Sequence, residues 1–432
     1  MKLIYKFLTI WILLTSIFLL SFSSETFASS DISIDSEAAI LIDADFGKIL
    51  YEKDAKKRMY PASTTKVMTA ILTVENCNLQ DNVTVSYWSI HSVPPTYTMG
   101  YITEGQILTV EELLNITMIS SANDAAYVLA EYISNLDNPD YLKDSSEEAK
   151  QSFDNSIAEF SEMMNKKAKE IGCLDTNFVN PNGIHNENHY STAYDLALIG
   201  KYAYSNSIIK NISSKATYDL PKNVVNDHTN YRSTVALLRA DSNYYYEYAN
   251  GMKTGYTDPA GYCMITTAKK DDMNLLAVVL KGRILEDGTR TRENDCIKLF
   301  NYGFENYTST SLIQEGDIAK TINVINGTDE SDSLDLLCTN TLDCIVDTGE
   351  VIDITPVINL TNVIAPIAKG EVVGTITYTI DEIEYSSDLI ASHDVYSSDA
   401  KSLIILLSII FIILLVVVLF LSIPKKHKNS GS

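Results

Sequence analysis

The strongest constraint on this chain is an uncharged apolar run close to its C-terminus. Residues 403–423 read "LIILLSIIFIILLVVVLFLSI" and contain no charged residue, glycine or proline. As a helix, such a run is long enough to cross the ~30 Å hydrocarbon core of a bilayer, and it lacks the polar face of an interfacial helix. Lys425, Lys426 and Lys428 follow it, and a positive flank favours the cytoplasmic side. We therefore expect a membrane-spanning helix at 403–423, a cytoplasmic tail at 424–432, and the preceding residues outside the cytoplasm.

The N-terminus has the pattern of a secretory signal. Lys2 and Lys6 flank the start of the apolar segment "FLTIWILLTSIFLLSF", and "TFA" ending at Ala28 offers a small-residue cleavage site. Retention as an uncleaved anchor is the alternative. In both cases the protein crosses a membrane, and residues 1–28 are not part of the fold.

Composition indicates a globular protein of more than one unit. The chain has 432 residues, of which 46% are hydrophobic, so two or three units with sizeable cores are expected. The formal net charge is −23. This charge argues against a nucleic-acid partner, which would require a basic patch, and a solvated acidic surface explains it without a special ligand.

The cysteines and histidines form no metal-binding pattern. No CxxC occurs, and His185 and His189 lie in the turn-rich segment "NPNGIHNENHYST" rather than on a helix. We expect no metal and no cofactor. An even number of cysteines outside the cytoplasm permits disulfides; Cys338 and Cys344 are the only pair close in sequence and form a candidate bridge. The other cysteines, which we expect to be free, are Cys77, Cys173, Cys263 and Cys296.

The chain divides into two units of different character. Residues 38–52 are typical of two strands around a turn, residues 61–200 carry several helical patterns, and residues 215–282 return to strand-like runs before a last helix near 290–305. This order predicts an α+β domain at 31–305, with helices over an antiparallel sheet. Residues 310–395 are rich in short β-branched runs and predict a small all-β domain. Residues 396–402 then form a linker.

The stretch "YPASTTKVMTA" places a serine and a lysine three residues apart at a predicted helix start. This spacing puts Ser63 and Lys66 on one helix face, with Ser63 in the first turn, where the helix dipole favours negative charge. A hydroxyl becomes a nucleophile when a base removes its proton, and a desolvated lysine can act as that base. By itself, however, the pattern is more typical of an ordinary helix cap. The sequence assigns Thr64 and Thr65 no role beyond packing and spacing.

Two further polar motifs stand in otherwise apolar surroundings. Ser121–Ala122–Asn123 interrupts a helical stretch, where polar side chains need hydrogen-bond partners. Ser121 and Asn123 either form a kink between two helices, with their hydrogen bonds made within the protein, or provide a proton relay and an amide that binds the substrate. Lys253–Thr254–Gly255 lies in a predicted strand and offers a cation, a hydroxyl and a backbone that a ligand can approach closely. A solvated strand face is the ordinary interpretation of this motif alone.

Together, the three motifs resemble the three signatures of the penicillin-binding protein and β-lactamase superfamily. The surrounding segments "ISSANDAAYVLAEYI", "FVNPNGIHNENHYSTAYDLALIGKYA" and "GMKTGYTDPAGYC" are similar to those of low-molecular-mass D-alanyl-D-alanine carboxypeptidases, the serine peptidases that trim peptidoglycan stems. The resemblance covers residues 31–305 closely. Residues 310–395, with "APIAKGEVVGTI", more loosely resemble the C-terminal β domain of that family.

The resemblance implies a serine acyl-transfer mechanism on peptidoglycan stem peptides that end in D-Ala-D-Ala. Ser63 would attack the carbonyl between the two D-alanines, and Lys66 would be the general base. Ser121 would pass the proton to the leaving D-alanine, and Asn123 would hold the site and the substrate amide. Water would then hydrolyse the acyl-enzyme, and β-lactam antibiotics would be covalent inhibitors.

The third motif would bind the substrate's terminal carboxylate. The resemblance implies positive potential from Lys253, a hydrogen bond from Thr254, and close backbone approach at Gly255. The backbone N–H groups of Ser63 and Tyr256 would form the oxyanion hole.

The chain departs from its apparent relatives at two points, and one further residue is carried over from them by analogy. Some relatives carry histidine where this chain has Tyr256, which leaves pH dependence and substrate preference open. Relatives often end in an amphipathic membrane-surface helix rather than an apparent full span. Arg283 is expected to assist carboxylate binding by analogy, with an ordinary surface arginine as the alternative.

Two other functions remain open at this point. A class A β-lactamase would need a glutamate and an asparagine four residues apart downstream of the second motif, but Glu162 and Asn165 are one residue short of that spacing. The extra β domain also argues against a β-lactamase. A non-catalytic wall-binding homologue would keep the fold without forming a penicillin adduct.

Overall fold

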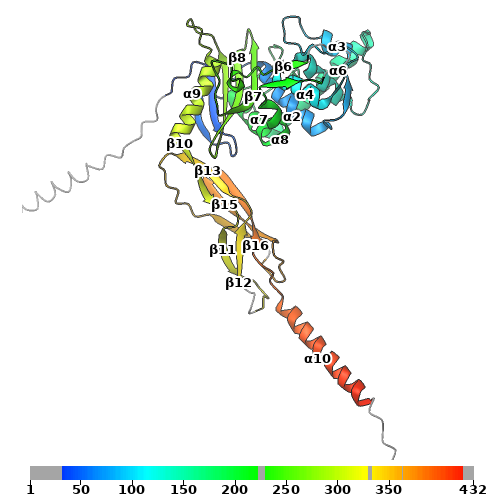
Figure 1. Cartoon of the computed structure of the whole chain (residues 1–432), viewed down its shortest axis with the longest axis vertical. Helices are drawn as coiled ribbons and strands as arrows, with labels where there is room; N and C mark the ends of the chain where they lie inside the picture. The colour runs from blue at the N-terminus through cyan, green and yellow to red at the C-terminus, as the bar shows by residue number, and fades with distance from the viewer. Residues whose placement is uncertain (1–31, 222–228, 329–332, 362, 422–432) are drawn as a thin grey trace, which may run out of the picture. The chain divides into compact units, whose positions relative to one another are not determined.

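The computed structural model of the chain describes residues 32–221, 229–328, 333–361 and 363–421 (Figure 1). The predicted signal segment at 1–28 and the predicted tail at 424–432 lie outside these ranges. The described residues form an α+β domain, an all-β domain and a C-terminal helix. The predicted fold class is thus confirmed for the first two parts.

The α+β domain is built on a five-stranded antiparallel sheet in the order β2-β1-β9-β8-β7. β1 and β2 come from the start of the domain, so the chain returns to them after the helical block. The strands are β1 (Ala38–Asp43), β2 (Ile49–Lys53), β7 (Ala249–Thr257), β8 (Gly261–Lys270) and β9 (Met273–Gly282). β7 lies at one edge of this sheet.

Helices cover both faces of the sheet. Leu275 and Leu276 are neighbours on β9, so their side chains point to opposite faces. A Cβ on Gly303 of α9 (Thr291–Asn306) would lie 2.6 Å from Leu275, and a Cβ on Gly200 of α7 (Ala193–Ser205) would lie 2.9 Å from Leu276. The two helices therefore pack on opposite faces, which explains why β1 is buried at every position rather than at alternate ones.

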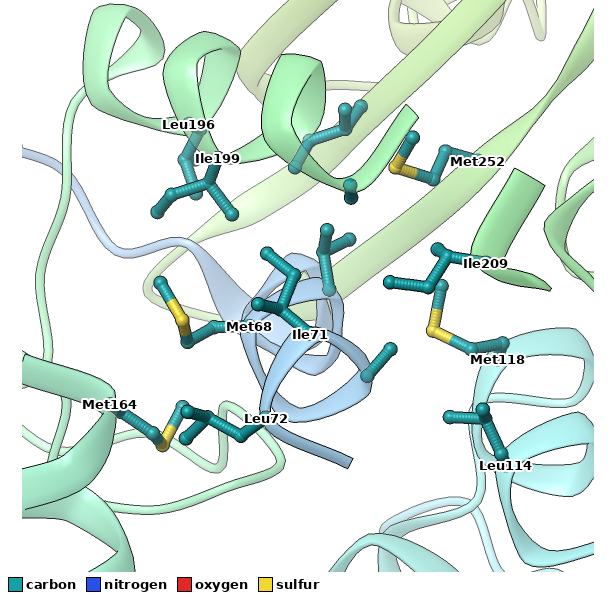
Figure 2. Close-up of a cluster of buried hydrophobic side chains, with 14 of the residues drawn as sticks. Met68, Ile71, Leu72, Leu114, Met118, Met164, Leu196, Ile199, Ile209 and Met252 are labelled. Atoms are coloured by element: carbon teal, nitrogen blue, oxygen red, sulfur yellow. The ribbon is translucent and has the colours of Figure 1, made fainter. Parts of the chain in front are cut away.

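The helical block surrounds one central helix, α2 (Lys66–Asn76). α2 contacts α4 (Val110–Ile119), α5 (Asn123–Ser134), α6 (Glu147–Ile171), α7 and α8 (Ser207–Ser213). Figure 2 shows its apolar side chains meeting those of its neighbours. The labelled residues are Met68, Ile71, Leu72, Leu114, Met118, Met164, Leu196, Ile199, Ile209 and Met252. Because α2 is enclosed on several sides, packing fixes the position of its first residues.

Short elements complete the domain. β3 pairs with β4, and β5 pairs with β6. Their bounds, with those of the remaining short helices, are β3 (Asn82–Thr84), α3 (Tyr87–His91), β4 (Ile107–Thr109), β5 (Thr217–Asp219), β6 (Asn230–Arg232) and η2 (Ala236–Leu238).

The regular elements described in the second domain are all strands, as its β-branched composition predicts. One pair, β10-β13, accompanies a five-stranded antiparallel sheet in the order β11-β12-β16-β15-β14. The strands are β10 (Tyr307–Ile313), β11 (Ile318–Asn323), β12 (Ser333–Cys338), β13 (Leu342–Asp347), β14 (Val357–Leu360), β15 (Val372–Ile380) and β16 (Ile383–Ala391). The domain has its own apolar core, which includes Leu334, Ile376 and Tyr385.

Two expectations differ from the structure in this region. The C-terminal apolar run forms a helix, α10 (Ser398–Leu421). Among the residues that the structure describes, none of the helices combines the length and apolarity needed to cross a membrane, so the expected membrane-spanning helix at 403–423 is not confirmed. The candidate bridge between Cys338 and Cys344 does not form, and all six cysteines are free thiols.

Candidate active site

Ser63 lies in a short 3-10 helix directly before α2. This element, η1 (Ala62–Thr65), is continued by α2 from Lys66. The sequence predicts a helix start at this stretch. The structure forms its first turn as a tighter 3-10 turn, which starts at Ala62 with a backbone φ of +48°. In a 3-10 helix residues three apart eclipse each other, so Ser63 and Lys66 are brought into direct register.

Lys66 is fully buried and hydrogen-bonded to Ser63. Its Nζ lies 2.9 Å from Ser63 Oγ, 2.8 Å from Asn123 Oδ1 and 2.8 Å from the carbonyl oxygen of Asn182. Burial lowers the pKa of Lys66 well below 10.5, and the positive charge of Lys253 lowers it further. The charge of Asp124 opposes this shift only in part. Among the described residues, no carboxylate lies within hydrogen-bond distance of Nζ, so the surroundings favour a neutral amine.

Thr64 and Thr65 secure the turn that carries Ser63. Thr64 Oγ1 donates to the carbonyl oxygen of Pro61, and Thr65 Oγ1 donates to that of Ala62, both at 2.7 Å. Thr65 Oγ1 also lies 2.8 Å from His189 Nε2. The two threonines therefore have a role that sequence reasoning missed: they satisfy the carbonyl groups of a turn with an unusual backbone.

His189 is a buried partner of this turn. The backbone N–H of Val179 donates to His189 Nδ1 at 3.1 Å, so Nε2 carries the proton and donates to Thr65. Burial lowers the pKa of His189 to about 3, which keeps the ring neutral. His189 therefore supports the site from behind without adding charge to it.

The second motif is confirmed as a break between two helices. α4 ends at Ile119 and α5 begins at Asn123, and Ser121 between them has a left-handed backbone with φ of +65°. Asn123 Nδ2 donates to the carbonyl oxygen of Thr98 at 2.8 Å, while its Oδ1 accepts from Lys66. The amide is thus held at both ends and connects Lys66 to the loop at Thr98.

The third motif lies on the edge strand β7. Lys253 is fully buried, and burial, with a smaller contribution from the charge of Arg292, lowers its pKa to about 7. Its Nζ donates to the carbonyl oxygen of Thr254 at 2.9 Å. Thr254 Oγ1 donates to Thr234 Oγ1 at 2.7 Å. This hydrogen bond fixes the orientation of the Thr254 hydroxyl and leaves its oxygen able to accept.

Gly255 brings β7 against the turn that carries Ser63. A Cβ at Gly255 would lie 2.8 Å from the backbone nitrogen of Ser63 and 3.0 Å from Pro61 O. Only glycine permits this approach. Tyr256 follows with a half-exposed side chain whose hydroxyl donates to Asp258 Oδ1 at 2.8 Å.

The arginine at the site is Arg292, not Arg283. Arg283 is exposed, does not line the cavity beside Ser63, and uses its backbone N–H to donate to Thr291 Oγ1. Arg292, at the start of α9, lines that cavity, pairs with Glu293, and lies over the Tyr262 ring at 5.4 Å. Sequence spacing could not find it, because β8 and β9 bring α9 to the site.

A cavity of about 400 Å³ joins the three motifs. Ser63, Ser121, Asn123 and Thr254 all line it, whereas Lys66 and Lys253 lie behind its wall. The lining residues are Ser63, Thr96, Tyr97, Thr98, Ser121, Asn123, Thr234, Thr254, Gly255, Tyr256, Thr257, Asp258 and Arg292. A serine beside a desolvated lysine, in a polar cavity with an arginine, has the chemistry of acyl transfer to a substrate that carries a carboxylate.

Comparison with known proteins decides the family. The model of the family described as D-alanyl-D-alanine carboxypeptidase matches residues 25–283, and that of the penicillin-binding protein 5 C-terminal domain matches residues 307–397. The chain belongs to the D-alanyl-D-alanine carboxypeptidase family. It is a serine-type D-alanyl-D-alanine carboxypeptidase of the low-molecular-mass penicillin-binding protein class, which confirms the resemblance drawn from the three motifs.

Relatives of this carboxypeptidase extend along nearly the whole chain. The D-alanyl-D-alanine carboxypeptidase DacF of Bacillus subtilis is 30% identical over 401 residues, which cover 89% of this chain and 93% of DacF. Penicillin-binding protein 5 of Haemophilus influenzae is 26% identical, with a TM-score of 0.62 over 85% of this chain and 99% of that structure. Penicillin-binding protein 3 of Streptococcus pneumoniae is 25% identical, with a TM-score of 0.70 over 84% of this chain and 100% of that structure. The similarity therefore includes the β domain as well as the catalytic domain.

Proposed function

We propose that the enzyme removes the terminal D-alanine from peptidoglycan stem pentapeptides through an acyl-enzyme on Ser63. The observation that carries this proposal is the 2.9 Å hydrogen bond between Ser63 Oγ and the buried amine of Lys66. A lysine whose pKa is lowered well below its ordinary value gives up its proton more easily, and its neutral amine can take the serine proton as Oγ attacks.

The attack forms a tetrahedral intermediate whose oxyanion needs donors. Ser63 belongs to the first turn of a helix, where backbone N–H groups lack intrahelical partners. The Ser63 N–H is therefore one oxyanion donor, and the N–H of Tyr256 on the adjacent edge strand is the other. The close packing of Gly255 on Ser63 supports this pairing, because donors fixed before the reaction stabilise the developing charge most effectively.

Collapse of the intermediate breaks the bond between the two D-alanines. The leaving amine takes up a proton, which Ser121 passes to it from the Lys66 side, while Asn123 holds Lys66 in place. Water then attacks the ester at Ser63 and regenerates the free hydroxyl. A β-lactam ring opened by Ser63 gives the corresponding penicilloyl ester, so we propose β-lactams as covalent inhibitors.

The carboxylate of the terminal D-alanine binds at the other end of the cavity. The hydrogen-bonded hydroxyl pair of Thr254 and Thr234 offers one proton to the carboxylate. Arg292 offers a guanidinium, and Lys253 adds positive potential from behind the wall. We place Arg292 in the role that sequence analysis gave to Arg283. A carboxylate between these groups fixes the scissile carbonyl over Ser63, which lowers the entropic cost of the attack.

We propose that the catalytic domain acts outside the cytoplasmic membrane and is held there by its C-terminal apolar segment. The support is in the sequence: a signal-like N-terminus, an uncharged run at 403–423, and lysines after it. Carbonate extraction of bacterial membranes, combined with protease added to intact protoplasts, tests this location. Release of the full-length chain by carbonate, or protection of the catalytic domain from protease, would refute it.

The function is tested with purified enzyme and a stem pentapeptide that ends in D-Ala-D-Ala. Free D-alanine should appear, and Ser63→Ala should abolish both its release and the adduct with labelled penicillin. Ser120→Ala is a matched control, because the Ser120 hydroxyl bonds to the Ile116 carbonyl of its own helix. Unchanged D-alanine release by Ser63→Ala would exclude the mechanism.

A further inference from the structure

One carboxylate at the catalytic cavity has no part in the mechanism. Asp258 lies directly after the edge strand β7 and lines the same cavity as Ser63. It is the only acidic residue among the residues described as lining this cavity. The other charged side chain in the lining is Arg292, which is already paired with Glu293.

The Asp258 side chain is not used to hold its own turn. In the β7–β8 turn the Thr257 hydroxyl accepts from the backbone N–H of Ala260 at 3.2 Å. Asp258 instead accepts from the Tyr256 hydroxyl through Oδ1. The residue is exposed, so its carboxylate is open to a ligand that enters the cavity.

The order of groups along β7 gives the direction of a bound substrate. If the proposed function holds, the terminal carboxylate lies at Thr254 and the scissile carbonyl lies at the Tyr256 N–H. Extended peptides pair with open sheet edges through their backbones, so the upstream residues continue along β7 toward Asp258. Asp258 is two residues beyond Tyr256, in the turn that begins where β7 ends. A substrate bound in this direction therefore has the residues before its D-Ala-D-Ala pair on the Asp258 side of the cavity.

We propose that Asp258 is a specificity residue that binds a positively charged amine on the side chain of the residue preceding D-Ala-D-Ala. The inference rests on the proposed function and specifies which substrates it takes. The Tyr256 hydroxyl orients the carboxylate, and the amine of an incoming stem peptide pairs with it. A peptide whose side-chain amine is acetylated keeps the scissile bond and the terminal carboxylate but lacks this ion pair.

The test compares two tripeptides, one with a free lysine amine before D-Ala-D-Ala and one with that amine acetylated. The wild-type enzyme should have a kcat/KM about fivefold higher for the free amine, the size of one partly exposed ion pair. This preference should shrink as salt is added. Asp258→Asn should reduce the ratio to near one by slowing only the free-amine peptide, and Asp258→Glu should keep most of the preference.

Two controls separate the possible failures. Asp272→Asn removes an equal charge from an exposed turn outside this cavity and should leave the preference unchanged. The rate of penicillin acylation reports an intact site, since penicillin lacks the amine. A wild-type enzyme with no preference, or an Asp258→Asn enzyme that keeps it, overturns the inference while D-alanine release still supports the function. If the wild type releases no D-alanine from either peptide, the proposed function itself fails.

Discussion

Gly183 is the residue whose replacement tests most directly how Ser63 is held. It follows Asn182, whose carbonyl accepts from both Ser63 Oγ and Lys66 Nζ. Its backbone φ is +79°, and a Cβ at this position would lie 1.9 Å from Ala62 O and 2.9 Å from Ser63 N. Gly183→Ala must therefore displace the turn that carries Ser63, because the atoms in the way are backbone.

The magnitude follows from two terms. A left-handed backbone costs alanine about 1–2 kcal/mol relative to glycine. The contact with Ala62 O must also open from 1.9 Å to at least 3.4 Å for ordinary packing, and such overpacking costs about 1–3 kcal/mol of folding free energy. A shift of about 1 Å in a reacting group can cost about 10²-fold in rate, so we expect a loss of that size in Ser63 acylation.

The assay measures the rate of labelled-penicillin acylation together with urea unfolding. Gly105→Ala is the matched control, because its φ of +73° is similar while nothing lies within 4 Å of its added Cβ. Gly105→Ala should lower the folding stability by the cost of a left-handed alanine, about 1–2 kcal/mol, but should keep the wild-type acylation rate. Acylation by Gly183→Ala within threefold of wild type, or an equal loss in Gly105→Ala, would refute the argument that backbone contact positions Ser63.

Three other predictions concern charge. Lys66 must be neutral to accept a proton, and the charge of Lys253 lowers the pKa of Lys66. Lys253→Met should therefore raise this pKa and move the acid limb of the penicillin-acylation pH profile to higher pH. An acid limb that does not move would contradict this. Arg292→Leu should reduce kcat/KM for a D-Ala-D-Ala peptide roughly 30-fold, the scale of a charge-assisted hydrogen bond. Arg283→Leu should stay within twofold of the wild type. Equal losses in the two variants would contradict the assignment of carboxylate binding to Arg292 rather than Arg283. Burial raises the pKa of Glu131 to about 7 from 4.5, so its contribution to stability is fully present below pH 4.5 and is lost as pH rises through 7. The gain in stability of Glu131→Gln over the wild type should therefore be about 3 kcal/mol larger at pH 8 than at pH 4. Urea midpoints of the variant that shift equally at both pH values would contradict this.

Local patterns predicted the elements of the fold and the three motifs. The break at Ser121 was visible because polar residues interrupt an apolar helical repeat, and α4 and α5 do end and begin around it. The edge strand at Lys253 and the all-β composition after residue 310 were also visible from short-range periodicity. These features depend on residues close in sequence, which is why the sequence alone could indicate them.

Features that depend on distant contacts were not predicted. Analogy with the resembled family pointed to Arg283, and no sequence pattern pointed to Arg292, which reaches the cavity through the packing of α9 against the sheet and the Tyr262 ring. The lowered pKa of Lys253 likewise depends on burial that only the assembled domain provides. Short-range patterns carry no information about either contact.

The 3-10 geometry of η1 explains why Ser63 and Lys66 function as a pair rather than as two residues on a helix face. An α-helix would offset residues three apart, whereas a 3-10 turn eclipses them and allows the 2.9 Å contact. Such a turn is less stable than an α-helical one, so it needs support from outside. Thr65 supplies part of that support by donating to Ala62 O while His189 donates to Thr65. The two threonines between the serine and the lysine are thus part of what holds the nucleophile to its base.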